Sequence, residues 1–199
     1  MFRHSDLFCS RCGAFAAKIV NFQIETDRLI MRDWRQDDLD AFHAINSDPK
    51  VRATLGPIMT REEVADLIVR MRGLQEKYGY CFWALVRKSD GQLIGWCGMI
   101  RGAPDVPVAD KLEIGWRLAS ETWGNGYITE AARKCIKWAS VQFPGENIWA
   151  ITSANNRRSR AVMERLNMTY LPDMDFDHPS VDPESKLLRH VTYCTERSK

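Results

Sequence analysis

The sequence predicts a single domain of the α+β class, on three observations. The chain has 199 residues, which is enough for one domain with a sizeable core. Its apolar content of 45% and its charged content of 27% are ordinary for a soluble globular protein. The expected strands come first and the expected helix crossovers follow, an order that favours one mixed sheet with helices packed on it.

The expected elements follow from apolar periodicity and from turn residues. In chain order they are strand 28–32, helix 37–45, helix 60–78, strands 81–87 and 92–101, a loop over 102–110, strand 111–118, helix 129–141, strand 148–152, helix 156–166, and strands 169–171 and 188–195. A polar loop over 175–186 separates the last two strands.

The early elements carry clear local signals. Residues 28–32, RLIMR, alternate charged and apolar side chains as a half-buried strand does. Thr60 and Glu63 form a capping box at the start of the long helix, and Gly79 ends that helix. The two strands that follow are joined by a Ser-Asp-Gly turn at 89–91, which suits a hairpin.

The most informative stretch is EIGWRLASETWGNGYITEAA, residues 113–132. It reads as a strand, a loop with Gly124 and Gly126, and a helix rich in alanine. Glycines let a backbone approach a ligand closely, and the free N–H groups of a helix N-terminus attract anions. The loop therefore predicts a cradle for a diphosphate, although a plain tight turn has the same pattern. Thr129 stands where a dinucleotide fingerprint has its third glycine, and no Gly-Lys-Ser or Gly-Lys-Thr follows as in a P-loop.

A second segment decides between these interpretations. Residues 148–168, IWAITSANNRRSRAVMERLNM, read as a buried strand, an Asn-rich turn and a short amphipathic helix. In this order the two segments resemble the GNAT superfamily of acyl-CoA-dependent N-acetyltransferases. Residues 123–128 match its phosphate loop, and residues 156–159 match its Asn-x-x-Ser.

The resemblance extends over most of the chain, roughly from residue 24 to residue 194. TDRLIMRDWRQDDLDAF, residues 26–42, and LIGWCGMI, residues 93–100, are similar to the branch that contains the ribosomal-protein N-terminal acetyltransferases. The resemblance implies a central, mostly antiparallel sheet flanked by helices. It also implies that this sheet splays between the family's fourth and fifth strands, here 111–118 and 148–152. The acetyltransferase domain is then expected over 24–199, preceded by an N-terminal extension over 1–23.

Acetyl-CoA is the co-substrate that the resemblance implies. The pantetheine arm is expected in the wedge between the splayed strands, bonded to exposed strand backbone. The residues expected to contact the coenzyme are Trp116, Arg117, Leu118, Trp123, Gly124, Asn125, Gly126, Tyr127, Ile128, Thr129, Asn156 and Ser159.

The chemistry requires a neutral amine that attacks the thioester carbonyl. A lysine side chain has a pKa of about 10.4 and an α-amine a pKa near 8, so an α-amine acceptor needs only a modest base. Glu113 is expected to be that base, acting through water, and its competing interpretation is an exposed strand residue in an ion pair. Ser159 or Tyr170 is expected to protonate the departing thiolate. A backbone N–H near Trp116 is expected to stabilise the oxyanion.

Four residues depart from the family pattern. Trp123 stands where the superfamily often has Arg or Gln. Ile128 replaces a Gly or Ala and is expected to crowd the backbone near the pyrophosphate. Met163 stands where many members carry a Tyr that protonates the thiolate. Asn167 replaces a glycine, a mild change because Asn tolerates a left-handed helix C-cap.

Two other classes of protein stay open. A non-catalytic, regulatory acyl-CoA-binding module is suggested by Ile128 and Met163, and it would release no thiol. A nucleic-acid-binding protein would use Arg157, Arg158 and Arg160, but a net charge of only +2 argues against it. These arginines equally fit attraction of the coenzyme's 3′-phosphate or a solvated helix face. The amine acceptor is open among a protein N-terminus, a polyamine, an aminoglycoside and an amino acid.

Composition also sets expectations about location and partners. No apolar run approaches the roughly 18 residues that span a membrane, and the N-terminus lacks the continuous apolar core of a signal peptide. The cysteine usage fits a reducing setting, so a cytoplasmic location is expected. Cys9 and Cys12 form a lone C-x-x-C without a second ligand pair, so no metal site is expected. A homodimer is left open.

Overall fold

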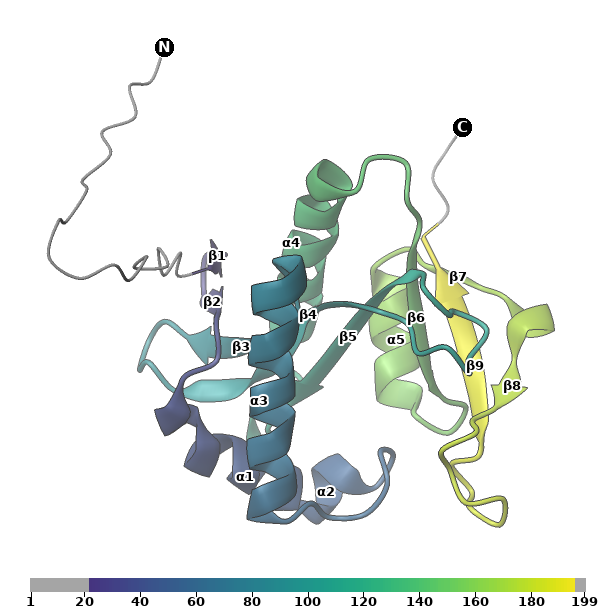
Figure 1. Cartoon of the computed structure of the whole chain (residues 1–199), viewed down its shortest axis with the longest axis horizontal. Helices are drawn as coiled ribbons and strands as arrows, with labels where there is room; N and C mark the ends of the chain where they lie inside the picture. The colour runs from purple at the N-terminus through teal and green to yellow at the C-terminus, as the bar shows by residue number, and fades with distance from the viewer. Residues whose placement is uncertain (1–21, 196–199) are drawn as a thin grey trace, which may run out of the picture.

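The computed structural model describes residues 22–195, which form one mixed sheet with helices on both faces (Figure 1). Its elements are β1 (Gln23–Glu25), β2 (Leu29–Arg32), α1 (Leu39–Ser47), α2 (Pro49–Arg52), α3 (Arg61–Tyr78), β3 (Phe82–Arg87), β4 (Leu93–Arg101), β5 (Leu112–Leu118), α4 (Tyr127–Gln142), β6 (Ile148–Ser153), α5 (Arg157–Arg165), β7 (Thr169–Tyr170), β8 (Phe176–Asp177) and β9 (Arg189–Cys194).

The sheet has the strand order β1-β2-β3-β4-β5-β6-β9-β7, with β8 paired to β9. Every strand pair is antiparallel except β5 with β6, which is parallel. The predicted α+β class and mostly antiparallel sheet are thus confirmed. Three short elements, β1, α2 and β8, were not predicted, because segments of two to four residues carry no measurable periodicity.

The two faces of the sheet carry different helices. Adjacent residues on a strand point to opposite faces. On β4, the sulfur of Cys97 lies 3.8 Å from that of Cys135 on α4. Its neighbour Trp96 instead packs against the guanidinium of Arg117, which donates to Asn46 on α1. Hence α4 covers one face and α1 the other, while α5 contacts α4 and α3 packs against α1.

The sheet opens between β5 and β6. These strands are paired only at Leu112 with Ile148 and at Glu113 with Trp149, and beyond that point they diverge (Figure 1). From Trp149 to Ser153, β6 is instead paired with β9. The predicted splay between the two strands is confirmed, and it leaves one edge of β5 without a strand partner within the described chain.

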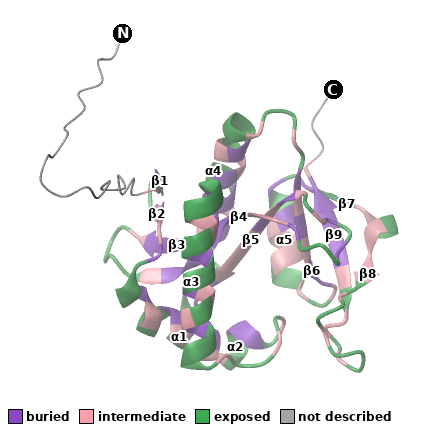
Figure 2. Cartoon of the chain, viewed as in Figure 1, coloured by how far each residue is buried: buried purple, intermediate pink, exposed green. Residues whose placement is uncertain are grey.

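Small side chains let α4 lie close to the sheet. Its buried stripe includes Ala131, Ala132, Cys135 and Ala139, and Figure 2 shows the buried residues gathered between the helices and the strands. Cys81, Cys97 and Cys135 are fully buried core residues, as predicted. Burial raises the pKa of the Cys135 thiol well above its usual value. Cys9 and Cys12 lie outside the described residues.

The predicted helix ends are present. The Thr60 hydroxyl accepts from the N–H of Glu63 at 3.2 Å, and the Glu63 carboxylate accepts from the N–H of Thr60 at 2.7 Å. Gly79 ends α3 with φ of 79°, and Asn167 follows α5 with φ of 56°. Both angles are left-handed, a region that favours Gly and, after it, Asn.

Asn167→Ala should therefore destabilise the fold. Alanine in the left-handed region costs about 1–2 kcal/mol, because its Cβ approaches the following carbonyl. Urea unfolding should show a lower midpoint with an unchanged slope. Asn167→Gly is the matched variant, and it should unfold at or above the wild-type midpoint. Equal midpoints for the Ala variant and the wild type would contradict this account of the end of α5.

Candidate active site

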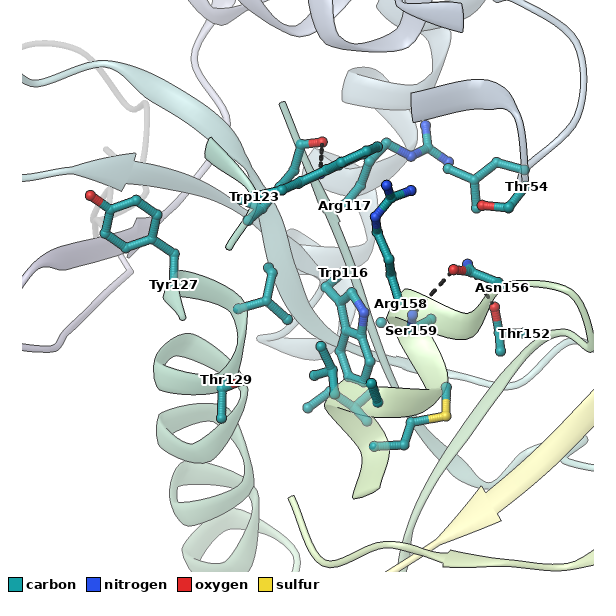
Figure 3. A pocket seen from close by; sticks show the side chains of 18 of the residues that line it. Thr54, Trp116, Arg117, Trp123, Tyr127, Thr129, Thr152, Asn156, Arg158 and Ser159 are labelled. Carbon is teal, nitrogen blue, oxygen red and sulfur yellow. Dashed lines mark hydrogen bonds between the residues drawn. The ribbon is translucent and has the colours of Figure 1, made fainter. Parts of the chain in front are cut away.

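A cavity of about 770 Å³ lies where β5 and β6 separate. Its walls come from β5, the loop after β5, α4, β6, α5 and the segment after α2. Figure 3 shows its lining side chains, with Trp116 between α4 and α5 and Arg117 directed the other way, toward Thr54. The sequence-predicted residues that line it are Glu113, Trp116, Arg117, Leu118, Trp123, Gly124, Gly126, Tyr127, Ile128, Thr129, Asn156 and Ser159.

The glycine loop shapes one end of the cavity. Gly124 and Gly126 have φ of 80° and 77°, and Gly126 is the N-cap of α4. The first hydrogen bond of the helix runs from the N–H of Glu130 to the carbonyl of Gly126 at 3.1 Å. The preceding N–H groups, at 127–129, therefore have no partner in the helix. This helix N-terminus can hold an anion.

Asn125 supports the loop from outside the cavity. Its amide donates to the carbonyls of Thr122 at 3.1 Å and Trp123 at 3.2 Å, so its side chain is turned back onto the loop. Its own carbonyl accepts from Arg28 at 3.0 Å. Asn125 does not line the cavity in this structure.

Arg28 fastens this loop to the N-terminal strands. Its Nε lies 2.6 Å from the Glu130 carboxylate, and its guanidinium lies 4.6 Å from the centre of the Tyr127 ring. The hydroxyl of Thr26 also donates to Glu130, at 2.5 Å. Contacts between residues about 100 positions apart thus fix the glycine loop and the start of α4 to the N-terminal strands. No local pattern in the sequence indicates these contacts.

The free edge of β5 presents backbone groups to the cavity. Between β4 and β5, residues opposite each other bond in alternation, and the N–H of Gly102 donates to the Lys111 carbonyl at 2.9 Å. Because this alternation continues along β5, the N–H and C=O groups of Arg117 face β4. The N–H and C=O groups of Trp116 and Leu118 face β6. Because the pairing with β6 ends at Glu113, these last groups are open to an extended ligand.

Glu113 lies at the narrow end of the wedge, beside the last β5–β6 pair. Burial raises the pKa of its carboxyl from 4.5 to about 7. Its carboxylate forms no ion pair with any residue of the described chain, so the ion-pair interpretation of this residue does not apply. A carboxyl group with a pKa near neutrality can exchange a proton with a ligand.

The Asn-x-x-Ser segment caps α5 at the opposite wall. The Asn156 side chain accepts from the N–H of Ser159 at 3.1 Å and donates to the Thr152 hydroxyl at 3.0 Å (Figure 3). Asn156 is thus the N-cap of α5, and this fixes where Ser159 lies. The Ser159 hydroxyl donates to no other described residue. Met163 is almost fully buried and lines the cavity below it.

Tyr170 lies outside the cavity. It is exposed on β7, and its hydroxyl donates to Asp175 at 2.6 Å. Arg160 is beside it, bonded to the Tyr193 hydroxyl at 3.2 Å. The arginine cluster is therefore divided, because Arg157 and Arg158 line the cavity and Arg160 does not.

A basic hollow adjoins the outer side of the α4 N-terminus. It shares Gly126, Thr129 and Arg165 with the cavity. Its further cations include Arg133, Lys134 and Lys137. The sequence motifs did not indicate this group, although the spacing RKxxK along one helix is a signal for neighbouring positive charges.

No helix in the described part of the chain is long and apolar enough to cross a membrane. Within residues 22–195, no group of three or more metal-ligating side chains comes together.

Comparisons with known proteins agree on one family. The model of the acetyltransferase (GNAT) domain matches residues 28–169. The uncharacterized N-acetyltransferase YoaA of Bacillus subtilis (strain 168) is 27% identical over 146 residues, which cover 72% of this chain and 80% of YoaA.

Solved structures share the fold. RimL, a ribosomal L7/L12 alpha-N-protein acetyltransferase, superposes with a TM-score of 0.72 at 13% identity, covering 88% of this chain and 94% of RimL. The microcin C7 self immunity acetyltransferase MccE, solved in complex with acetyl-CoA and AMP, superposes with a TM-score of 0.68 at 12% identity, covering 85% of this chain and 93% of MccE.

Proposed function

The chain belongs to the GNAT acetyltransferase family, and we propose that it moves an acetyl group from acetyl-CoA to a primary amine by direct attack on the thioester. One observation carries the proposal. A single cavity connects the free N–H groups that begin α4, the open edge of β5 and the carboxyl of Glu113. These are the parts that a diphosphate, an amide-bearing arm and an amine need.

The coenzyme would lie along the length of this cavity. The N–H groups at 126–129 would hold its pyrophosphate, and the backbones of Trp116 and Leu118 would bond the pantetheine amides. Ile128 packs in the core with 7% of its surface exposed, and it also lines the cavity. Arg158, whose guanidinium lies 4.3 Å from the Trp123 ring centre, and the basic hollow on α4 are candidates for the 3′-phosphate.

The acceptor amine would lose its proton to Glu113, directly or through water, and attack the thioester carbonyl. The new C–N bond forms, the C–S bond breaks, and the thiolate leaves. The N–H groups along β5 would stabilise the oxyanion, an interaction worth about 3 kcal/mol in typical sites. Ser159, which lines the cavity, would return a proton to the thiolate. Tyr170 would not, since its hydroxyl lies outside the cavity and is bonded to Asp175.

An acceptor panel tests this function. The purified chain with acetyl-CoA should release free thiol in the presence of at least one class among N-terminal peptides, polyamines, aminoglycosides and amino acids. Calorimetry should be run alongside. Acetyl-CoA binding without thiol release from any amine would favour the non-catalytic acyl-CoA-binding module instead.

Acetyl-CoA should stabilise the folded chain. A ligand that binds only the folded state adds about 2.7 kcal/mol when its concentration is 100 times its Kd. Thermal melts should therefore shift upward by several degrees with saturating acetyl-CoA. Adenosine, which lacks the diphosphate and the pantetheine, is the control and should shift the melt far less. An unchanged melt with acetyl-CoA would contradict coenzyme binding at the cavity.

A further inference from the structure

The acceptor side of the cavity carries a charged group that acetyl transfer does not require. Glu113, Gly115 and Arg117 are alternate residues of β5 and therefore lie on the same face of the sheet. Figure 3 shows the side chains of Arg117 and Trp116 directed to opposite sides. A Cβ on Gly115 would lie 2.8 Å from the ring of Phe82, so the floor between the two charged side chains is aromatic. Along the strand, Glu113 and Arg117 are roughly 13 Å apart.

Arg117 has only neutral partners. Its Nη1 donates to the Asn46 side chain and lies 4.0 Å from the sulfur of Met59, and its guanidinium lies 5.6 Å from the centre of a Trp96 ring. Its Nε is shielded from solvent and has no hydrogen-bond partner. Across residues 22–195, Nη2 donates to no atom and no ion pair includes this side chain. Burying Nε without a partner is unfavourable, whereas Nη2 is not shielded and is open to a ligand in the cavity.

A second cation lies beside it. Arg52 is buried and its Nε donates to the carbonyl of Pro57 at 2.6 Å. Burial, and then the charge of Arg52, lower the pKa of Arg117 to about 9, so the Arg117 guanidinium stays protonated at neutral pH. The acidic group that faces Arg52 is Glu63, whose carboxylate is already used to cap α3 at Thr60. Arg117 lines the cavity, whereas Arg52 does not line it and adds positive charge from behind.

We propose that Nη2 of Arg117, the nitrogen of this guanidinium that is neither shielded nor bonded within the described chain, binds a carboxylate of the acceptor. This inference rests on the proposed function and specifies its substrate class, an amine that carries a carboxylate several bonds away. Nη2 carries two N–H donors of a charged group, and such donors form short, strong hydrogen bonds to a carboxylate. With the amine at Glu113, the rest of the acceptor would cross the aromatic floor.

Matched acceptor pairs test the proposal. One arm uses tripeptide amides with Asp or Asn at the first, second or third position, which keep the same α-amine. The other arm uses 6-aminohexanoate against 6-aminohexanamide, to separate a peptide source of the carboxylate from a free amino acid. A charge-assisted bond should give the carboxylate form about a tenfold or larger advantage in kcat/KM in at least one pair.

Variants then assign this preference to Arg117. Arg117→Gln should bring the kcat/KM ratio of the preferred pair to within about twofold of unity, and a ratio cancels any loss common to both acceptors. Arg117→Lys keeps the charge without the guanidinium and should retain part of the preference. Asn46→Asp keeps Arg117 but supplies an internal carboxylate, and it should also abolish the preference.

Arg158→Gln is the control from the coenzyme end of the same cavity, and it should leave the acceptor ratio as in the wild type. Equal turnover of both members of every pair, or a preference that survives in Arg117→Gln, would overturn the carboxylate site and leave acetyl transfer standing. Folded protein that binds acetyl-CoA but releases thiol with no acceptor in either arm would overturn the proposed function itself.

Discussion

Glu113→Gln should lower kcat/KM by about 10²–10³ at pH 7, and this deficit should shrink as the pH rises. The pKa of Glu113 is about 7, so wild-type activity should increase with pH through that value as the carboxylate forms. Glutamine keeps the size of the side chain but accepts no proton. An α-amine has a pKa near 8, so above that pH the acceptor is mostly neutral without a base, and Glu113 becomes dispensable.

The measurement is kcat/KM against pH for both forms, once an acceptor has been found. Glu184→Gln, an exposed carboxylate in the loop before β9, is the matched control and should follow the wild-type profile. A deficit that is constant across pH would reject Glu113 as the base and favour a role in positioning. Full activity at every pH would assign proton removal to water.

The same substitution gives a stability readout. The folded-state pKa of Glu113 is raised above its usual 4.5, so the folded chain favours the protonated form. This contribution to stability is fully present below about pH 4.5 and is lost as the pH rises through about 7. The Gln variant carries no such loss, so its melting temperature relative to wild type should increase between pH 4 and pH 8. A constant difference would mean that the carboxyl is not desolvated in solution.

Gly126→Val should raise the Kd for acetyl-CoA by at least about tenfold, because it alters the helix N-terminus that we propose binds the diphosphate. Gly126 has φ of 77°, so valine strains the backbone, and its branched side chain would stand at the mouth of the cradle. The backbone strain alone is worth about 1–2 kcal/mol, so a lower melting temperature is expected as well. Calorimetric titration of the folded variant measures the affinity.

Gly79→Val separates the two effects. Gly79 has φ of 79° at the end of α3, and a Cβ there would meet no atom within 4 Å. This variant should lose a similar amount of thermal stability and bind acetyl-CoA as the wild type does. If both variants keep wild-type affinity, the coenzyme phosphates lie elsewhere.

Several parts of this protein could be read from neighbouring residues alone. The capping box at Thr60, the stop at Gly79 and the strand, glycine loop and helix around Gly126 depend on contacts within a few positions. The expected bounds of the longer elements therefore agree with the structure to within about two residues. The residues expected to face the coenzyme followed from the same local motifs, because a helix N-terminus attracts anions.

The tertiary structure decided which of these groups act together. Arg28 meets Glu130, and Arg117 meets Asn46, across 102 and 71 positions of sequence. The same packing separates Arg160 from Arg157 and Arg158, and places Tyr170 outside the cavity. No periodicity or spacing encodes such pairings, since they depend on which faces the sheet brings together.

The tertiary structure also decided the charge states of the ionisable residues in the cavity. Glu113 and Arg117 are ordinary ionisable residues in the sequence. Burial in the fold shifts the pKa of Glu113 to about 7, and burial together with the charge of Arg52 shifts that of Arg117 to about 9. The sequence by itself determined the family, the strand-loop-helix motifs and the expected place of the coenzyme. Burial, pairing and the unmet donors of Arg117 belong to the tertiary structure, because desolvation depends on long-range packing that no local segment contains.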